Sequence, residues 1–192
     1  MSRPDIAAII LAAGASTRFG AIKQTMDYDG EPLIRRSVNA LLQTTATPVI
    51  VVLGANADQI REAIKDLNVE TVVNESWQSG IASSIAAGTR RVRESNASAA
   101  LITLADQPLV DSTALSRLID AFDDSHRVVA SSYAGTIGVP AIFAREFFDD
   151  LESLSGDRGA GQWLRTHADI VTSIPLPEAE VDIDTPEDIR NR

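Results

Sequence analysis

The sequence contains no cysteine in 192 residues. Disulfide bonds, thiolate zinc sites and cysteine-held iron–sulfur clusters are therefore excluded. The sequence also has no excess of basic residues, because 17 Lys and Arg stand against 27 Asp and Glu, for a formal net charge of −10. Without a basic excess to bind a phosphate backbone, no nucleic-acid partner is expected. A compact anionic ligand remains compatible with this charge, since one Arg and one Lys in a pocket, with a metal ion, can dominate the local field.

Long hydrophobic runs are absent as well. No run reaches the length of a membrane span, so no membrane association is expected. The apolar stretch Ile6–Ala13 lacks a strong basic leader, which disfavours a signal peptide. We therefore expect a soluble cytoplasmic protein. The remaining composition, 44% hydrophobic and 23% charged, is ordinary for a globular protein. The length suits one domain, so we expect a single domain over residues 1–192.

Apolar runs alternate with amphipathic segments along the chain. The predicted strands are Ile6–Leu11, Pro48–Leu53, Glu70–Val73, Ala99–Leu104, Arg127–Ser131 and Pro140–Phe143. The predicted helices are Pro32–Leu42, Ala57–Leu67, Ile81–Val92, Ser112–Phe122, Arg145–Leu154 and Ala160–His167. This alternation predicts an α/β fold with a mostly parallel sheet, and the continuous apolar strands predict helices on both faces. Ligands of such sheets bind at the carboxyl ends of the strands, so the residues that follow each strand are the functional candidates.

The loop after the first strand reads LAAGASTRFGAIK, from Leu11 to Lys23. Its small residues are Ala12, Ala13, Gly14 and Ala15. Small side chains let backbone N–H groups approach a phosphate, and Arg18 and Lys23 would supply positive charge for a triphosphate. The pattern is neither a P-loop nor a dinucleotide fingerprint. The alternative interpretation is a glycine-containing turn with two solvent-facing cations.

Carboxylates follow the predicted strand Ala99–Leu104, and others alternate with apolar residues near the end of the sequence. Asp106, in LITLADQPLV, comes after the strand Ala99–Leu104, where a carboxylate can hold Mg²⁺ against phosphate oxygens. The alternative for Asp106 is an incidental turn residue. In VDIDTPEDI, either Asp182 or Asp184 could complete the metal site, and the same segment is also a good helix start. For Asp182 we expect solvent exposure.

Three weaker signals remain. In NESWQSGIASSIAAG, the small and hydroxyl residues could let a nucleotide base lie against the backbone. Helix packing through small residues explains the same pattern equally well. The candidate binding residues are Asn74, Gly80 and Ser84. The segments GTIGVPAIF and LSGDRGAGQWL could face a second substrate; their candidates are Gly138, Pro140, Gly156, Asp157 and Arg158. His126 and His167 are expected at the surface. No Ser-His-Asp set and no H-E-x-x-H zinc motif is evident.

Together these motifs resemble a known family, the molybdenum cofactor nucleotidylyltransferases or MobA-like NTP transferases. The segments that carry the resemblance are LAAGASTRFGAIK, NESWQSGIASS, LADQP, GVPAIF, SGDRGA and DIDTPED, over about residues 6–188. The nearest branch is the cytidylyltransferase that joins CTP to molybdopterin. LAAG, rather than LAGG, is similar to CTP-using members, so CTP is expected before GTP. Phe19 stands where methionine is common.

The resemblance implies a Rossmann-like nucleotidyltransferase fold of the nucleotide-diphospho-sugar transferase type that uses Mg²⁺. It implies that the loop at Ala12–Gly14 meets the nucleotide, that Arg18 and Lys23 contact phosphates, and that Asp106 and Asp184 bind the metal. TIGVPAIF is similar to a branch found beside purine-oxidising and other molybdenum hydroxylases, which leaves the acceptor open and makes a hydroxylase a candidate partner. Alternatives are a sugar-1-phosphate or guanylyl-type nucleotidyltransferase, and a non-catalytic cofactor chaperone for a hydroxylase.

Overall fold

The computed structural model describes residues 4–16, 19–183, 185 and 188. Seven strands form one sheet in the order β5-β4-β1-β6-β8-β7-β9. Their bounds are β1 Ile6–Ala12, β4 Val49–Leu53, β5 Glu70–Val73, β6 Ala99–Leu104, β7 Val128–Tyr133, β8 Thr136–Ala144 and β9 Thr172–Pro175. Neighbouring strands are parallel except where β8 pairs with β6 and β7. The predicted mostly parallel α/β fold of Rossmann-like type is confirmed.

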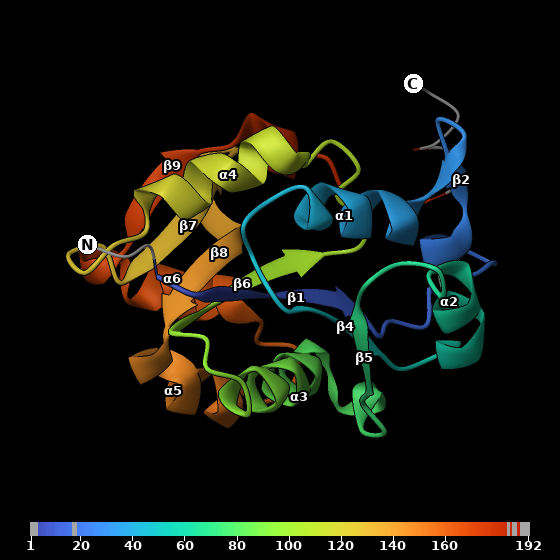
Figure 1. The fold of residues 1–192 in the computed structure, drawn as a ribbon, viewed down its shortest axis with the longest axis horizontal. Helices are drawn as coiled ribbons and strands as arrows, with labels where there is room; N and C mark the ends of the chain where they lie inside the picture. Colours follow the sequence, from blue (N-terminus) through green and yellow to red (C-terminus); the bar gives the residue numbers. More distant parts are fainter. Residues whose placement is uncertain (1–3, 17–18, 184, 186–187, 189–192) are drawn as a thin grey trace.

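Helices cover both faces of this sheet (Figure 1). Their bounds are α1 Leu33–Leu42, α2 Ala57–Ala63, α3 Ile81–Arg93, α4 Ser112–Ala121, α5 Phe148–Ser153 and α6 Ala160–Thr166. Short 3₁₀ segments are η1 Lys23–Thr25, η2 Trp77–Ser79, η3 Arg145–Phe147, η4 Ala168–Ile170 and η5 Pro177–Glu180, and a small hairpin pairs β2 Asp27–Tyr28 with β3 Glu31–Pro32. No helix in the described ranges combines the length and apolar character needed to cross a membrane.

Strand β1 shows why the sheet has two covered faces. All seven of its residues are buried. Because side chains alternate along a strand, Ala8 and Ile10 join the core under α1, α2 and α4, whereas Ile9 and Leu11 join the core under α3, α5 and α6. Fully burying one such side chain contributes roughly 1.5–3 kcal/mol, so a strand that is apolar at every position is stable only between two helical layers.

Most predicted elements are present, and the differences have local causes. The predicted strand Pro140–Phe143 begins earlier, at Thr136, because Ala134 and Gly135 form a tight turn with positive φ angles of 47° and 74°. Pro140 is accommodated inside β8 because the pairing register shifts there: Ala130 faces Ala141 while Ser131 faces Gly138. Strand β9 was not predicted.

Helix ends also differ from the predictions in places. Helix α2 ends at Ala63 rather than Leu67, and the predicted helix Arg145–Leu154 is a 3₁₀ turn followed by α5. Pro32 is the N-cap of α1 and not a residue of its first turn. The predicted start of α4 is confirmed, since the Asp111 side chain accepts a hydrogen bond of 2.8 Å from the Ala114 N–H.

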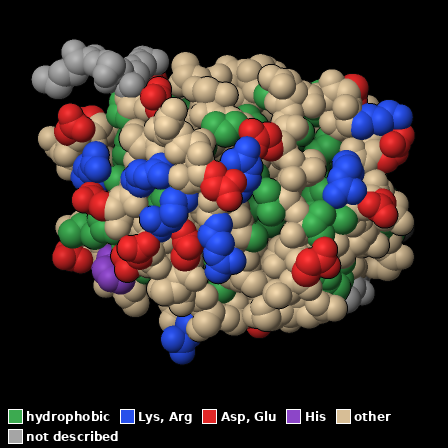
Figure 2. Space-filling model, turned by 60° about the horizontal axis from the view of Figure 1, so that its bottom comes forward, with side chains coloured by type: hydrophobic (Ala, Val, Ile, Leu, Met, Phe, Trp, Pro, Cys, Tyr) green, Lys and Arg blue, Asp and Glu red, His purple; other side chains and the backbone are tan. Residues whose placement is uncertain are grey.

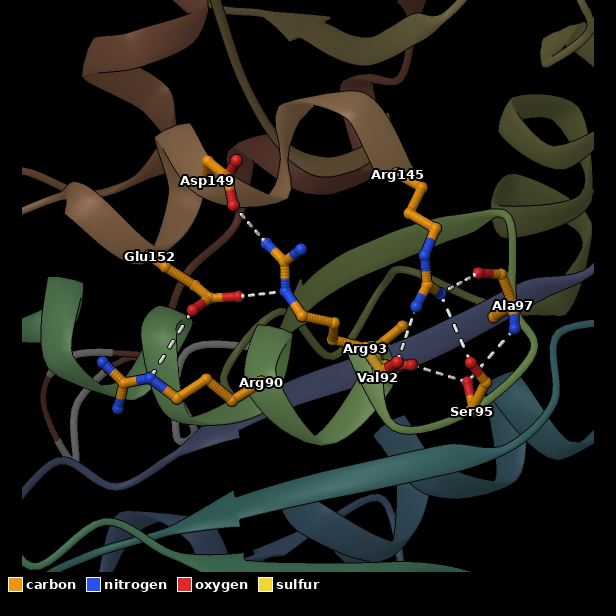
Figure 3. Close-up of polar contacts among 8 residues, drawn as sticks. All are labelled: Arg90, Val92, Arg93, Ser95, Ala97, Arg145, Asp149 and Glu152. Atoms are coloured by element: carbon orange, nitrogen blue, oxygen red, sulfur yellow. Dashed lines mark hydrogen bonds and ion pairs between the residues drawn. The ribbon is translucent and has the colours of Figure 1, made fainter.

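A charged network holds the C-terminal end of α3 against α5. Acidic and basic side chains intermix over this face of the molecule (Figure 2). Arg93 bonds Asp149 at 2.6 Å and Glu152 at 2.8 Å (Figure 3). The Arg145 guanidinium donates to the carbonyls of Arg93 and Ala97 at 2.6 and 2.7 Å, and more weakly to that of Ser95 at 3.3 Å. Helix α3 is thereby anchored at the end far from the candidate site.

Candidate active site

A pocket of about 510 Å³ opens at the carboxyl ends of β1 and β6. The loop after β1 forms one wall, the segment from Trp77 to Ser84 forms a second, and residues 104–106 at the end of β6 form the floor. Asp157 joins from the loop between α5 and α6. The volume lies in the range of small-molecule sites, and the position is the edge at which parallel sheets bind ligands.

Lys23 and Asp106 form an ion pair at the pocket floor. The Lys23 Nζ atom lies 2.7 Å from the Asp106 Oδ2 atom, and the two side chains are 13% and 25% exposed. Lys23 belongs to η1 and Asp106 to the loop after β6, so residues 83 positions apart in sequence meet here. This pair therefore presents one positive and one negative group to the pocket, which suits a ligand made of an anion and a bound cation.

The other oxygen of Asp106 fits a divalent cation. Among the described residues, the buried Asp106 Oδ1 atom has no hydrogen-bond partner. A buried carboxylate oxygen without a partner is unfavourable unless a ligand satisfies it. In the same ranges, no group of three or more His, Cys, Asp or Glu side chains could hold a metal by itself. Mg²⁺ typically needs only one or two carboxylates beside substrate phosphates and waters, so Asp106 is sufficient to begin such a site.

The loop after β1 lies where the sequence predicts. Leu11, Ala13 and Gly14 line the pocket, whereas Ala12 is buried at the end of β1. Gly14 is open, because a Cβ atom added there would meet no heavy atom within 4 Å. The predicted Arg18 and the predicted metal ligand Asp184 lie outside the described residues. Their roles stay predictions.

Asn74 lies behind the pocket wall and does not line it. It is 6% exposed, and its side-chain amide donates to the hydroxyls of Ser83 and Ser84 at 2.8 and 3.0 Å. Its Oδ1 atom accepts from the Ser76 N–H at 3.0 Å. Asn74 thus ties the end of β5 to the first turn of α3, and Ser84 is the member of this group that reaches the pocket.

Gly80 brings two loops together at the start of α3. Its φ angle is 104°, and a Cβ atom added there would lie 2.3 Å from the Gly156 carbonyl oxygen. That oxygen accepts from the Ala82 N–H at 3.2 Å, which satisfies one of the free donors of the helix start. This contact places the Gly156 loop beside the pocket. Asp157 lines the pocket, whereas Arg158 is exposed to solvent.

The other two acceptor-side predictions lie in β8. Pro140 is buried at the register shift, and Gly138 is buried against the Tyr133 ring, where an added Cβ atom would lie 2.5 Å from the hydroxyl oxygen. Gly138 thus leaves room for the Tyr133 ring, and neither Gly138 nor Pro140 lines the pocket. Burial, and then the nearby charge of Asp182, raises the pKa of the Tyr133 phenol. The neutral phenol donates to the Val139 carbonyl at 3.1 Å.

The remaining expectations concern exposed groups. Asp182 is exposed, as predicted. His126 is exposed beside Asp123, and His167 is partly exposed and stacks on Trp163 with ring centroids 4.1 Å apart. Neither histidine lines the pocket.

Sequence reasoning missed several pocket residues, among them Ser16, Gln24 and Trp77. Gln24 is 5% exposed, Ser16 has a φ angle of 53°, and Trp77 supplies an aromatic wall. Gln24 directly follows the predicted site residue Lys23. The sequence around it does not predict whether its side-chain amide is buried or exposed, because a single glutamine in a short polar segment forms no periodic pattern. The WQSG segment of Trp77 was noted only for its small residues.

Comparison with known proteins places this arrangement among nucleotide-handling domains. A family model described as MobA-like NTP transferase domain matches residues 8–171. The nicotine blue oxidoreductase of Paenarthrobacter nicotinovorans is 29% identical, over 96% of this chain and 94% of its own length. The purine catabolism protein PucB of Bacillus subtilis (strain 168) is 27% identical, over 98% of this chain and 96% of its own.

Solved structures agree with this result. Rv0371c from Mycobacterium tuberculosis H37Rv matches with a TM-score of 0.85 at 28% identity, and the match covers 99% of this chain and 98% of that one. Its complex with manganese matches with a TM-score of 0.81 at 27% identity, and covers 97% of both chains. A similar protein thus binds a divalent metal.

Proposed function

The chain belongs to the MobA-like NTP transferase domain family, and from this premise we propose that it transfers CMP from Mg-CTP to a phosphorylated acceptor, with release of pyrophosphate. The acceptor we propose is molybdopterin or the molybdenum cofactor. The observation that carries the proposal is the 2.7 Å pair of Lys23 and Asp106 in the pocket, with the second Asp106 oxygen left for a cation. The choice of CTP and of a pterin acceptor is supported by the motif resemblance alone.

The reaction requires little covalent chemistry from the protein. An oxygen of the acceptor's terminal phosphate attacks the α-phosphorus of CTP, a new P–O bond forms, and the bond to pyrophosphate breaks. Catalysis then depends on alignment and on neutralising charge at the α-phosphate and the leaving group. Lys23 would stabilise that charge directly, and Arg18 is the predicted second cation. Asp106, with the predicted Asp184, would hold Mg²⁺, which when bound neutralises phosphate charge.

A binding panel tests the nucleotide. Thermal unfolding is measured with CTP, GTP, ATP and UTP, each with and without Mg²⁺. Stabilisation by Mg-CTP above the other three supports the proposal, because a ligand that binds only the folded state raises the unfolding temperature. A preference for Mg-GTP would assign the protein to the guanylyl type and overturn the choice of CTP.

A second assay tests the acceptor. Pyrophosphate release is measured with Mg-CTP and either molybdopterin or a panel of sugar 1-phosphates. Release that depends on molybdopterin supports the proposal, and release that depends on a sugar phosphate overturns it. The proposed product is the dinucleotide of molybdopterin and CMP. Binding of this product without any pyrophosphate release would instead indicate a cofactor chaperone, with a molybdenum hydroxylase as its partner.

A further inference from the structure

Gln24 is a buried amide whose hydrogen bonds all go to the pocket loop. Its Nε2 atom donates to the Gly14 carbonyl at 3.1 Å and to the Ala12 carbonyl at 3.4 Å. Its Oε1 atom accepts from the Ser16 hydroxyl at 3.1 Å. Both ends of the amide therefore hold one loop, while the preceding residue, Lys23, reaches across to Asp106. Adjacent residues of η1 thus serve two different parts of the pocket.

Most backbone carbonyls in the first part of this loop accept hydrogen bonds from other residues of the protein. The Ala13 carbonyl accepts from the Ala55 N–H at 3.1 Å, and the Ser16 carbonyl accepts from the Phe19 N–H at 2.9 Å. With the two carbonyls held by Gln24, four carbonyls between positions 12 and 16 are bound to protein donors. In contrast, the N–H groups of residues 14–16 donate to no acceptor within the described part of the chain. The loop's unused polar groups are therefore donors.

Ser16 shows that this loop conformation has to be held in place. Its φ angle of 53° is in the left-handed region, which a residue with a Cβ atom adopts only when its surroundings impose it. Its hydroxyl accepts from the Lys23 N–H at 3.3 Å and donates to Gln24. Successive N–H groups next to a left-handed residue form a concave anion site. Ser16 lines the pocket, so that site faces the space where a ligand would lie.

We propose that Gln24 is a positioning residue: by tying back the carbonyls of Ala12 and Gly14, it presents the N–H groups of residues 14–16 to phosphate oxygens of the nucleotide. This inference rests on the proposed function, because it assumes that the pocket binds a nucleoside triphosphate. The role requires an amide. The NH₂ group supplies hydrogens to two carbonyls while the oxygen accepts from Ser16, and an ionised glutamate has no hydrogen to donate.

The test compares Gln24→Ala and Gln24→Glu with wild type and with Gln43→Ala, a matched control at the exposed C-cap of α1. Dissociation constants for Mg-CTP and for Mg-pyrophosphate are measured between pH 8 and pH 5.5. We expect both Gln24 variants to bind about 10- to 100-fold more weakly at pH 8, because misplaced donors lose their geometry, and Gln43→Ala to match wild type.

The pH profile separates positioning from a general structural role. The carboxyl of Gln24→Glu is buried beside carbonyls, so its pKa rises, and below that pKa the protonated group again donates a hydrogen bond. Binding by Gln24→Glu should therefore recover several-fold toward pH 5.5 relative to wild type, whereas Gln24→Ala should show no recovery. Variants that bind like wild type at pH 8, or a Gln24→Glu deficit that is independent of pH, would overturn the proposal.

Hydrogen exchange in the free protein makes the two proposals separable. We expect the amides that donate to this loop, those of Phe19, Lys23 and Ala55, to exchange faster in Gln24→Ala than in wild type, with the amides of β1 unchanged. Exchange of these three amides that is the same in both proteins would overturn the positioning role whatever the ligand. Wild-type protein that binds neither Mg-CTP, another nucleotide nor pyrophosphate would instead overturn the proposed function, and the phosphate-binding part of this inference with it.

Discussion

The two ends of helix α3 differ in how their backbone groups are hydrogen-bonded. At its first turn, Gly80 has no side chain to cap the helix, and the bond from the Ala82 N–H goes to a carbonyl of a neighbouring loop. At its other end, Arg145 donates to three carbonyls of residues 93–97, and Arg93 bridges to two carboxylates of α5 (Figure 3). The first end lines the pocket, and the last end lies on the charged face seen in Figure 2.

The difference concerns what each region leaves unpaired. Around Arg93 and Arg145, charges and carbonyls are matched within the protein, so this region contributes to stability. In the pocket, the Asp106 Oδ1 atom and the N–H groups of residues 14–16 have no protein partner in the described ranges. Unpaired polar groups lower the stability of the folded protein. They are typical of binding sites, where a ligand supplies the missing hydrogen bonds. Substitutions in the pocket and at the C-terminal end of α3 should therefore separate activity from stability.

The largest effect is expected at Lys23. In Lys23→Ala, CMP transfer should fall by about 10²- to 10³-fold, because one preorganised charge at the reacting phosphates is lost. The unfolding temperature should change little by comparison. Initial rates of pyrophosphate release and a thermal scan check both parts. Lys65→Ala, which removes an exposed lysine paired with Glu62, is the control. Full turnover in Lys23→Ala would contradict the assigned role.

Substitution of Asp106 should change the dependence of activity on the Mg²⁺ concentration. In Asp106→Asn, the Mg²⁺ concentration for half-maximal activity should rise at least about tenfold, because an anionic oxygen ligand is lost. A Mg²⁺ titration of the rate measures this shift. Asp111→Asn is the matched control, because asparagine caps a helix about as well as aspartate. An unchanged titration for Asp106→Asn would favour a turn residue over a metal ligand.

At the C-terminal end of α3, the expected effect is on folding. Arg145→Ala removes charge-assisted hydrogen bonds to the carbonyl of the last helical residue, Arg93, and to that of Ala97 in the following loop, and should lower the free energy of unfolding by about 2 kcal/mol. Urea titration measures this change. The affinity for Mg-CTP should stay at the wild-type value. A variant with native stability and weakened nucleotide binding would reverse the comparison between the pocket and this end of α3.

The smallest effect is expected at Arg93. Its ion pairs with Asp149 and Glu152 are partly exposed, and exposed pairs are screened by water and salt. Arg93→Gln should shift the urea midpoint less than Arg145→Ala does, and the shift should shrink as NaCl is raised. The measurement is a pair of urea titrations at low and high salt. A shift larger than that of Arg145→Ala would show that the ion pairs, and not the carbonyl contacts, hold this end.

Prediction of the fold from sequence succeeded where burial alone decides the structure. Strands such as β1 and β4 were placed to within about one residue, because an unbroken apolar run can lie only between two helical layers. Strand β9 was missed because its Thr172–Pro175 segment is short and half exposed, and it pairs with β7 across a gap of about forty residues. The early start of β8 depended on a turn at Ala134 that only the hairpin pairing reveals.

Prediction of the site followed the same division. The chemistry of Lys23 and Asp106, and their place at the carboxyl edge of the sheet, follow from residue type and from the βαβ pattern, because parallel strands end at one edge. Their 2.7 Å contact, the burial of Gln24 beneath its loop, the hydrogen bonds of Asn74 and the packing of Gly138 depend on how distant segments meet. Local sequence determines which groups are available and on which edge they lie. Only tertiary packing decides which of them are held by the protein and which are left for a ligand.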